Sequence, residues 1–244
     1  MVARLRSSSD YLVDSALRGN VQKLAHVLFQ QTCRSDFSSP GFSLLPLGCG
    51  GTSRELRELM LRILDELSRI CQAERGAELV ALSMSRFNQQ TSTKPHRDGG
   101  PTESLLLLGY EPTSIVSHLA MADYSQCAHD LGLTPAEFLE HHNPMFPQGG
   151  ELLADYTTDL TEFDPRQFQI LLINNSVATF QGEAPRWQGV LHQATIPHPD
   201  ETAERVVNSI QLTPAGSETS TPVTVMERER FVKDDALGSQ YGRT

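Results

Sequence analysis

Hydrophobic residues in the first third of the chain recur at helical spacing. Thr52 and Glu55 stand three residues apart in the pattern of a capping box, which marks the start of a helix. The apolar residues that follow are Leu56, Leu59, Met60, Ile63, Leu64, Leu67 and Ile70. This i, i+3, i+4, i+7 spacing predicts an amphipathic helix over residues 53–74. Its apolar side must be buried, and a sheet is the expected partner.

A second helix is expected nearer the N-terminus. Ser9 or Asp10 is a suitable cap for it, and apolar residues continue at helical spacing as far as Leu28. Ser, Pro and Gly are frequent over residues 35–51, which predicts a loop between the two helices. We therefore assign residues 1–77 to an N-terminal helical support.

From residue 78 onward the pattern becomes that of strands. Short apolar and β-branched segments alternate with turn-forming residues. We predict strands within residues 79–90, 104–110, 114–121, 167–174, 189–196 and 205–213. Helices followed by many short strands favour an α+β fold with a rolled antiparallel core over residues 78–213. Residues 214–244 are a polar C-terminal extension of the same domain.

Two short helices are expected to interrupt the strands near residues 123–148. Asp123 is a suitable cap for the first helix, and Thr134 and Glu137 form a second capping box with Pro135 at the first helical position. Insertions of this kind are found where barrels open. We expect this one to cover the mouth of the core and to help select the substrate.

The composition limits the classes of partner. The chain has 244 residues, of which 39% are hydrophobic and 20% charged, as in ordinary globular proteins. Its net charge of −10 disfavours a nucleic-acid substrate. No apolar run reaches the roughly 18 residues of a membrane span, and the four cysteines show no metal-binding or redox spacing. We therefore expect a cytoplasmic protein that binds neither nucleic acid nor membranes.

Two histidines and one aspartate are the candidate metal ligands. His96 and Asp98 are two residues apart, so on an extended segment both side chains point to the same face. His192 lies in a later predicted strand, and two imidazoles with one carboxylate can bind a metal and leave positions open. A second pair, His198 and Asp200, lies in a proline-rich turn and has no histidine after it. The first pair with His192 is therefore the candidate metal site and catalytic centre.

Arg205 begins the last predicted strand, one turn after the strand of His192. A guanidinium that enters a mostly apolar strand needs acceptors for its N–H groups. A dicarboxylate ligand would provide them. Pairing with Asp200 or Glu204 at the surface is the alternative.

In their order and spacing, these four residues resemble the motif of the iron(II)/2-oxoglutarate-dependent dioxygenases, over roughly residues 78–213. The resemblance implies a double-stranded β-helix, a jelly-roll or cupin-like core supported by N-terminal helices. It also implies that His96, Asp98 and His192 bind Fe(II), that 2-oxoglutarate chelates the iron, and that O2 takes the last position. The far carboxylate of 2-oxoglutarate would pair with Arg205. The positive charge of Arg205 and the single positive charge that remains on the iron with its three ligands would then neutralise the two negative charges of 2-oxoglutarate.

One position departs from the family pattern. Many relatives have Ser, Thr or Asn two residues after the arginine, where it helps to hold 2-oxoglutarate, but here that residue is Val207. The second anchor is then expected elsewhere. Asn88 and Gln90 are the candidates, because both can point inward from the strand that precedes the metal ligands.

The sequence thus predicts a 2-oxoglutarate-dependent oxygenase that oxidises, by hydroxylation in the first instance, a small organic molecule. One alternative is a cupin-like metalloenzyme that does not use 2-oxoglutarate, in which Arg205 is structural or binds substrate. Another is a non-catalytic ligand-binding barrel without a metal. The oligomeric state is left open.

Overall fold

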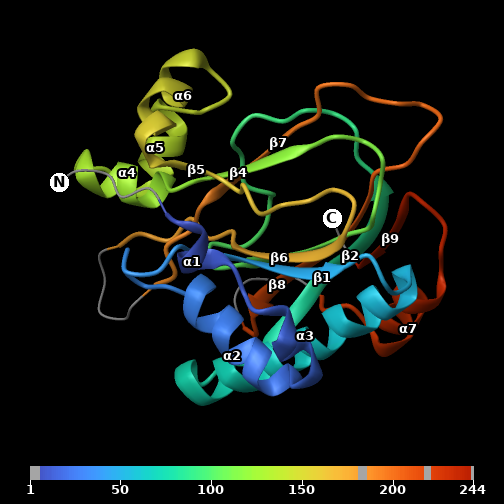
Figure 1. Ribbon diagram of the computed structural model, residues 1–244. Coiled ribbons are helices and arrows are strands. Elements are labelled where there is room, and N and C mark those ends of the chain that lie inside the picture. The colour runs from blue at the N-terminus through green and yellow to red at the C-terminus, as the bar shows by residue number, and fades with distance from the viewer. Residues whose placement is uncertain (1–5, 181–185, 217–220, 243–244) are drawn as a thin grey trace.

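The structure is a computed structural model that describes residues 6–180, 186–216 and 221–242. The described residues form a mixed α/β protein whose strands belong to two antiparallel sheets (Figure 1). The larger sheet has the order β1 (Phe42–Gly48), β6 (Phe168–Asn174), β3 (Leu105–Tyr110), β8 (Val206–Pro214), β2 (Leu79–Asn88) and β9 (Ser239–Gly242). The smaller sheet has the order β5 (Thr157–Asp159), β4 (His118–Ala122) and β7 (Leu191–Thr195).

The two sheets pack face to face. Their facing sides share one hydrophobic cluster, to which Leu108, Leu171 and Val207 contribute from the larger sheet, and Leu119 and Met121 from the smaller one. The chain crosses between the sheets repeatedly: β2 and β3 lie in the larger sheet, β4 and β5 in the smaller, β6 in the larger, β7 in the smaller and β8 in the larger. The predicted core of antiparallel strands is therefore present.

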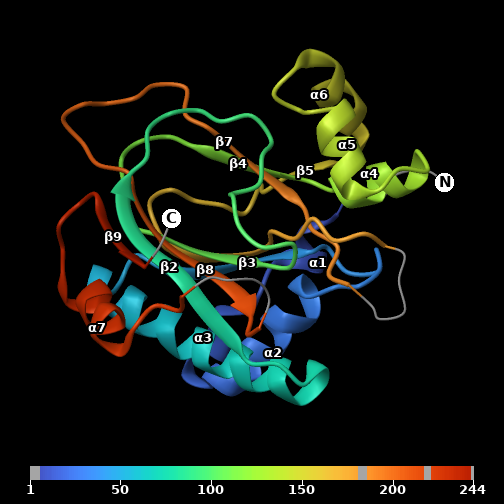
Figure 2. The same ribbon diagram turned by 180° about the vertical axis from the view of Figure 1, so that it is seen from behind.

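Two helices, α2 (Val21–Thr32) and α3 (Ser53–Arg75), cover the outer face of the larger sheet (Figure 2). The apolar side of α3 is buried against this sheet, as its spacing predicted, and the Thr52–Glu55 capping box is formed. The helix approaches the sheet closely at Gly109, where a Cβ atom would lie 2.5 Å from Sδ of Met60. Only glycine fits at that position without displacing the helix side chains.

The N-terminal region differs from the predicted helical support. The single helix expected up to Leu28 is divided into α1 (Ser8–Tyr11), the 3-10 helix η1 (Ser15–Gly19) and α2. The predicted loop over 35–51 contains β1, which forms an edge of the larger sheet through its pairing with β6. The apolar run of β1 is short and stands among turn-forming residues, which concealed it in the sequence.

The predicted insertion is a group of three helices, α4 (Tyr124–Asp130), α5 (Pro135–His141) and α6 (Pro147–Leu153). Its first two helices begin at the caps that the sequence indicated, Asp123 and Thr134. Buried side chains of Tyr124 and Phe138 form a small hydrophobic cluster with Leu191 of the smaller sheet. The insertion is thereby attached at one end of that sheet (Figure 1).

The C-terminal extension takes part in the fold. Thr224 and Glu227 form a capping box at the start of α7 (Val225–Lys233), and β9 then pairs with the edge strand β2. None of the described helices combines the length and the apolar character that a membrane-spanning helix requires.

Candidate metal centre

His96 and His192 lie directly opposite each other across an antiparallel bridge. The backbone N–H of His96 donates to the carbonyl of His192 at 3.0 Å, and the N–H of His192 donates to the carbonyl of His96 at 2.9 Å. His192 is part of β7, whereas the segment that carries His96 connects β2 to β3. The bridge places the two imidazole rings side by side, with their centroids 4.1 Å apart.

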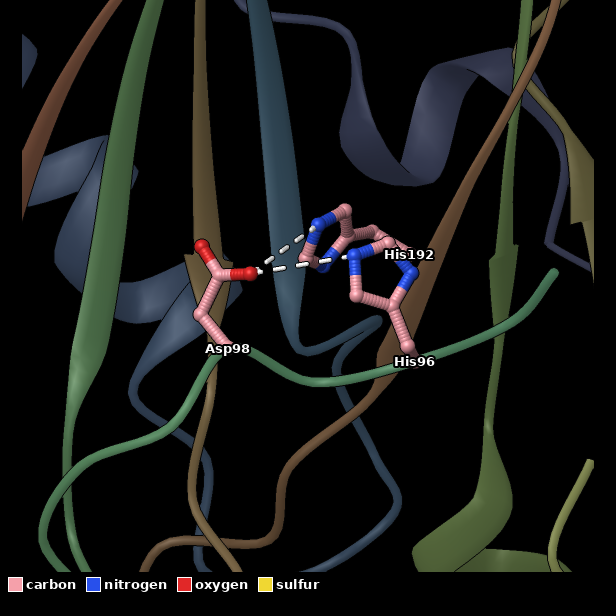
Figure 3. Close-up of side chains that lie close together, drawn as sticks. All are labelled: His96, Asp98 and His192. Carbon is pink, nitrogen blue, oxygen red and sulfur yellow. Dashed lines mark ion pairs between the residues drawn. The ribbon is translucent and has the colours of Figure 1, made fainter. Parts of the chain in front are cut away.

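Asp98 completes a group of three ligands (Figure 3). Its Oδ1 atom lies 3.7 Å from Nε2 of His96 and 3.9 Å from Nε2 of His192. One ligand atom from each residue lies within 4.8 Å of the other two. Two atoms bound at about 2.1 Å to one ion are at most about 4.2 Å apart, so small side-chain rotations allow all three to share a metal. The predicted convergence of these residues is confirmed, and their role as ligands stays a prediction.

Both imidazoles can present a lone pair to a metal. Nδ1 of His96 lies 2.8 Å from the carbonyl of Lys94, to which it donates, and this leaves Nε2 free toward Asp98. Burial lowers the pKa of His192 to about 4, although the nearby Asp98 carboxylate opposes the shift. His192 is therefore neutral near pH 7, as a ligand must be.

A cavity of about 160 Å³ adjoins the three ligands. Its remaining walls consist of four apolar side chains, from Phe87, Leu108, Ala194 and Val207, and four polar or aromatic ones, from Gln89, Thr93, Tyr110 and Arg205. Drug-sized ligands occupy pockets of roughly 300–1,000 Å³. This cavity suits a smaller molecule.

Arg205 lines this cavity and is only 2% exposed. Its Nε donates to Oγ of Ser117 at 3.0 Å, and its Nη1 donates to Oε1 of Gln89 at 2.5 Å. The guanidinium lies over the ring of Tyr110, 5.2 Å from the centroid. Nη2 is buried and has no hydrogen-bond partner among the described residues, and none of their carboxylates forms an ion pair with Arg205. The predicted surface alternative, pairing with Asp200 or Glu204, is not observed.

Within residues 6–180, 186–216 and 221–242, no carboxylate therefore compensates the charge of Arg205. Burial lowers its pKa, and the neighbouring Tyr110 opposes this shift. A guanidinium still remains protonated at any ordinary pH. A buried cation without a counter-ion is unfavourable, and an anion in the cavity would stabilise it.

Asn88 and Gln90, predicted to hold the cosubstrate, bond the backbone on either side of Glu204. Oδ1 of Asn88 accepts the backbone N–H of Arg205 at 2.9 Å, and Gln90 bonds the carbonyl of Ala203 at 2.8 Å. Neither side chain lines the cavity, whereas Gln89 does. Side chains alternate along an extended segment, so Asn88 and Gln89 face opposite sides. The cosubstrate role of Asn88 and Gln90 stays a prediction. Both residues support the turn that leads into β8.

Sequence reasoning also missed two residues of the site. Tyr110, at the end of β3, lines the cavity next to Arg205, and nothing in its apolar strand distinguishes it from a residue of the hydrophobic core. Asn175 follows β6 directly, and its side chain is fully buried and bonds the backbone of Asp98. No local pattern marks either residue, because the partners of each come from distant parts of the chain.

The insertion contacts the segment that carries the ligands. Nζ of Lys94 donates to the carbonyl of Met145, between α5 and α6, at 2.6 Å. Met145 and Phe146 are themselves exposed, at 54% and 67%. The structure thus places the insertion beside the segment that carries the candidate ligands, and its role as a lid stays a prediction.

Comparisons with known proteins add little to this description. No protein-family model matches the sequence, and no curated protein matches it. Among solved structures, a variant of the iron and alpha-ketoglutarate-dependent endoperoxidase NvfI is similar, with a TM-score of 0.39 and 12% sequence identity. That similarity covers 78% of this chain and 83% of the endoperoxidase chain. A likeness this weak establishes neither the fold nor the activity of the present chain.

Proposed function

We propose that this chain is a non-heme Fe(II) oxygenase that uses 2-oxoglutarate and O2 to oxidise a small organic substrate. The proposal rests on one observation: a group of three candidate metal ligands lies next to a cavity that contains a buried arginine. Two imidazoles and a carboxylate converge on one point, and the cavity beside them contains a buried arginine without an acidic partner among the described residues. The first feature suits a metal, and the second suits a small carboxylate ligand.

The donor set fits iron. Two histidines and one carboxylate on one side of an ion leave further positions open, which is typical of non-heme Fe(II) oxygenases. His96, Asp98 and His192 would hold the metal through Nε2, Oδ1 and Nε2. Asp98 is 44% exposed and His192 only 14%, so the group faces both solvent and the cavity. A substrate approaching from outside could therefore reach the centre.

The cavity fits 2-oxoglutarate. Arg205 would bind the far carboxylate with its free Nη2 donor, and the apolar walls formed by Leu108 and Val207 would exclude water from that ion pair. We infer that Tyr110 supplies the second anchor in place of Asn88 and Gln90. Burial raises the pKa of Tyr110 to about 12, so its hydroxyl stays protonated and can donate to a carboxylate.

When bound, iron and 2-oxoglutarate would supply oxidative decarboxylation, which consumes O2 and releases succinate and CO2. The protein's own residues position and balance the charges. With His96 and His192 neutral, the ion and Asp98 together keep one positive charge, and Arg205 adds a second. The two negative charges of 2-oxoglutarate then make the site neutral, which favours binding in a cavity of low dielectric.

The strand order supports the same interpretation of the fold. We propose that the two sheets form a double-stranded β-helix, in which the chain after β2 passes repeatedly from one sheet to the other. The pairings of β8 with β2 and β3, and of β7 with β4 and the His96 segment, support this arrangement. In it, the metal ligands lie between the sheets at one end of the core.

An anaerobic titration tests the proposed activity. Adding Fe(II) and then 2-oxoglutarate to the protein should produce a weak visible charge-transfer band, and Asp98→Ala should remove it. Arg205→Ala should require a much higher 2-oxoglutarate concentration for the same band, whereas iron affinity should change little. Gln90→Ala is the matched control, because Gln90 lies one residue from the cavity residue Gln89 but outside the cavity.

The possible results separate the alternatives. Metal binding at these residues without the band would contradict the use of 2-oxoglutarate and would favour a cupin-like metalloenzyme. Metal binding that is unaffected by Asp98→Ala would contradict the metal centre itself. Equal 2-oxoglutarate requirements in the Arg205→Ala variant and the wild type would contradict the assignment of the arginine.

A further inference from the structure

Asp98 differs from the two histidines in how its backbone is held. His96 and His192 bond each other in the manner of paired strands. Asp98 lies outside any strand, in the segment that leads from this bridge toward β3 (Figure 3). No neighbouring backbone forms a strand ladder with it, so its carboxylate depends on another support.

The side chain of Asn175 provides that support. Its Oδ1 accepts the backbone N–H of Asp98 at 3.0 Å, and its Nδ2 donates to the backbone carbonyl of Asp98 at 3.0 Å. A side-chain amide has the same donor and acceptor as a peptide group. Asn175 therefore replaces the missing strand partner and bonds both polar backbone groups of the ligand residue.

Asn175 is itself rigidly placed. It follows β6 directly and is 0% exposed. Its backbone N–H donates to the carbonyl of Ser104 at 2.9 Å, and its Nδ2 also donates to Oγ of Ser104 at 3.1 Å. A buried side chain whose polar atoms are all hydrogen-bonded is held in a single conformation. Asn175 can therefore hold the backbone of Asp98 in a fixed position.

Arg97 closes the same turn from the other side. Its Nε donates to the carbonyl of Asn175 at 3.1 Å, and its Nη2 donates to the carbonyls of Gly100 and Pro101 at 3.3 and 3.2 Å. Arg97 thus joins the residues that follow Asp98 to the backbone of Asn175.

We propose that Asn175 is a positioning residue that sets the place of the Asp98 carboxylate relative to the two imidazoles, and through it the metal affinity of the site. The inference rests on the proposed metal centre. The hydrogen bonds of Asn175 to Asp98 are made to its backbone N–H and carbonyl, so its effect passes through the backbone of Asp98. Outer groups that orient metal ligands typically contribute about 10–100-fold to metal affinity.

Asn174 offers a matched control. It is the same residue type, also 0% exposed and adjacent in sequence, but its Nδ2 donates to the carbonyl of Thr32 at 3.0 Å and its Oδ1 accepts the N–H of Ser176 at 3.3 Å, so neither bond is to Asp98. Loss of either side chain removes buried hydrogen bonds and lowers the melting temperature. Only the loss of Asn175 releases a metal ligand.

The test measures cobalt(II) affinity by visible absorption, together with thermal unfolding, in full-length protein. Asn175→Ala should weaken cobalt binding by about tenfold or more, and its bound spectrum should change toward that of Asp98→Ala. Asn174→Ala should bind cobalt within about twofold of the wild type at a similar loss of melting temperature. If Asn175→Ala does not fold, Asn175→Ser retains a polar group that is too short to bond both backbone groups, and should show the same loss.

Two results would overturn the inference. Cobalt binding by folded Asn175→Ala or Asn175→Ser at wild-type affinity would show that Asp98 needs no such support. An equal loss of affinity in Asn174→Ala would show a general effect of destabilisation. If Asp98→Ala also bound cobalt like the wild type, the metal centre would be wrong, and the inference about Asn175 would fall with it.

Discussion

Replacing Arg34 by alanine tests how the helical insertion is attached to the core. Arg34 follows α2, and its side chain is 1% exposed. It forms a two-bonded ion pair with Asp123, the residue that caps α4, and one of these bonds measures 2.7 Å. It also donates to the carbonyls of Gln188 at 3.0 Å and Ser39 at 2.9 Å. Three segments of the chain therefore meet at one guanidinium.

The expected cost follows from this burial. Removing one partner of a buried ion pair costs about 3–5 kcal/mol, because the other charge is left without compensation. The Asp123 side chain is 13% exposed, so water can reach it in the Arg34→Ala variant and the lower end of the range applies. A loss of about 3 kcal/mol corresponds to a decrease in melting temperature of roughly 6–12 °C for a chain of this size.

Thermal and urea unfolding of the purified variant measure this loss. Arg54→Ala is the control, because its pair with Glu58 is exposed at 61% and 47% and should contribute only about 0.3–0.5 kcal/mol. Combining Arg34→Ala with Asp123→Asn completes a double-mutant cycle, with an expected coupling of about 1–3 kcal/mol. A melting temperature within about 2 °C of the wild type, or a coupling of zero, would refute the role given to this pair.

Three further outcomes are expected. Gly109→Ala should lower the free energy of unfolding by about 1–3 kcal/mol, since the new Cβ would overlap a side chain of α3. Gly50 has open space around it, so Gly50→Ala should change this free energy little. Equal losses for the two variants in a urea titration would contradict the packing argument. A thiol reagent should modify exposed Cys49 in the native protein and Cys71 only after unfolding. Cys71 is inaccessible in the folded state, and its burial raises the pKa of the thiol to about 11. Mass spectrometry of the labelled sites checks this order. Burial raises the pKa of Tyr110 from 10.0 to about 12, so between these pH values the unfolded chain releases a proton that the folded state retains. The free energy of unfolding therefore falls as the pH rises from about 10 to 12. Urea unfolding at several pH values should show a shallower decline for Tyr110→Phe.

Local sequence patterns determined the elements whose causes are local. The helix α3 begins at the Thr52–Glu55 capping box, and α4 and α5 begin at caps that are visible in the sequence. The convergence of His96, Asp98 and His192 was also predictable. This convergence needs only two ligands that point to the same face of one segment and a further histidine on a neighbouring strand. The spacing of His96 and Asp98 and the order of the predicted strands indicated both.

The choice between Asn88 and Gln89 was beyond local patterns. Both are polar residues at the end of one predicted strand, and a shift of one residue exchanges the faces. The face is set by pairing with β8, in which Asn88 lies opposite Val206. The helix α7 and the strand β9 likewise belong to a segment whose composition resembles a loose tail, and their order depends on contacts with α3 and β2.

Only the tertiary structure decided the surroundings of the candidate metal ligands. Arg205 has acidic residues near it in sequence, yet the fold turns its guanidinium into the cavity, where its contacts are Gln89, Ser117 and Tyr110. Asn175 supports Asp98 across a separation of 77 residues. Periodicity and capping report interactions within a few residues of the chain. The partner of a buried polar group is set by which distant strands become neighbours and in which register, and these contacts exist only after the sheets have packed.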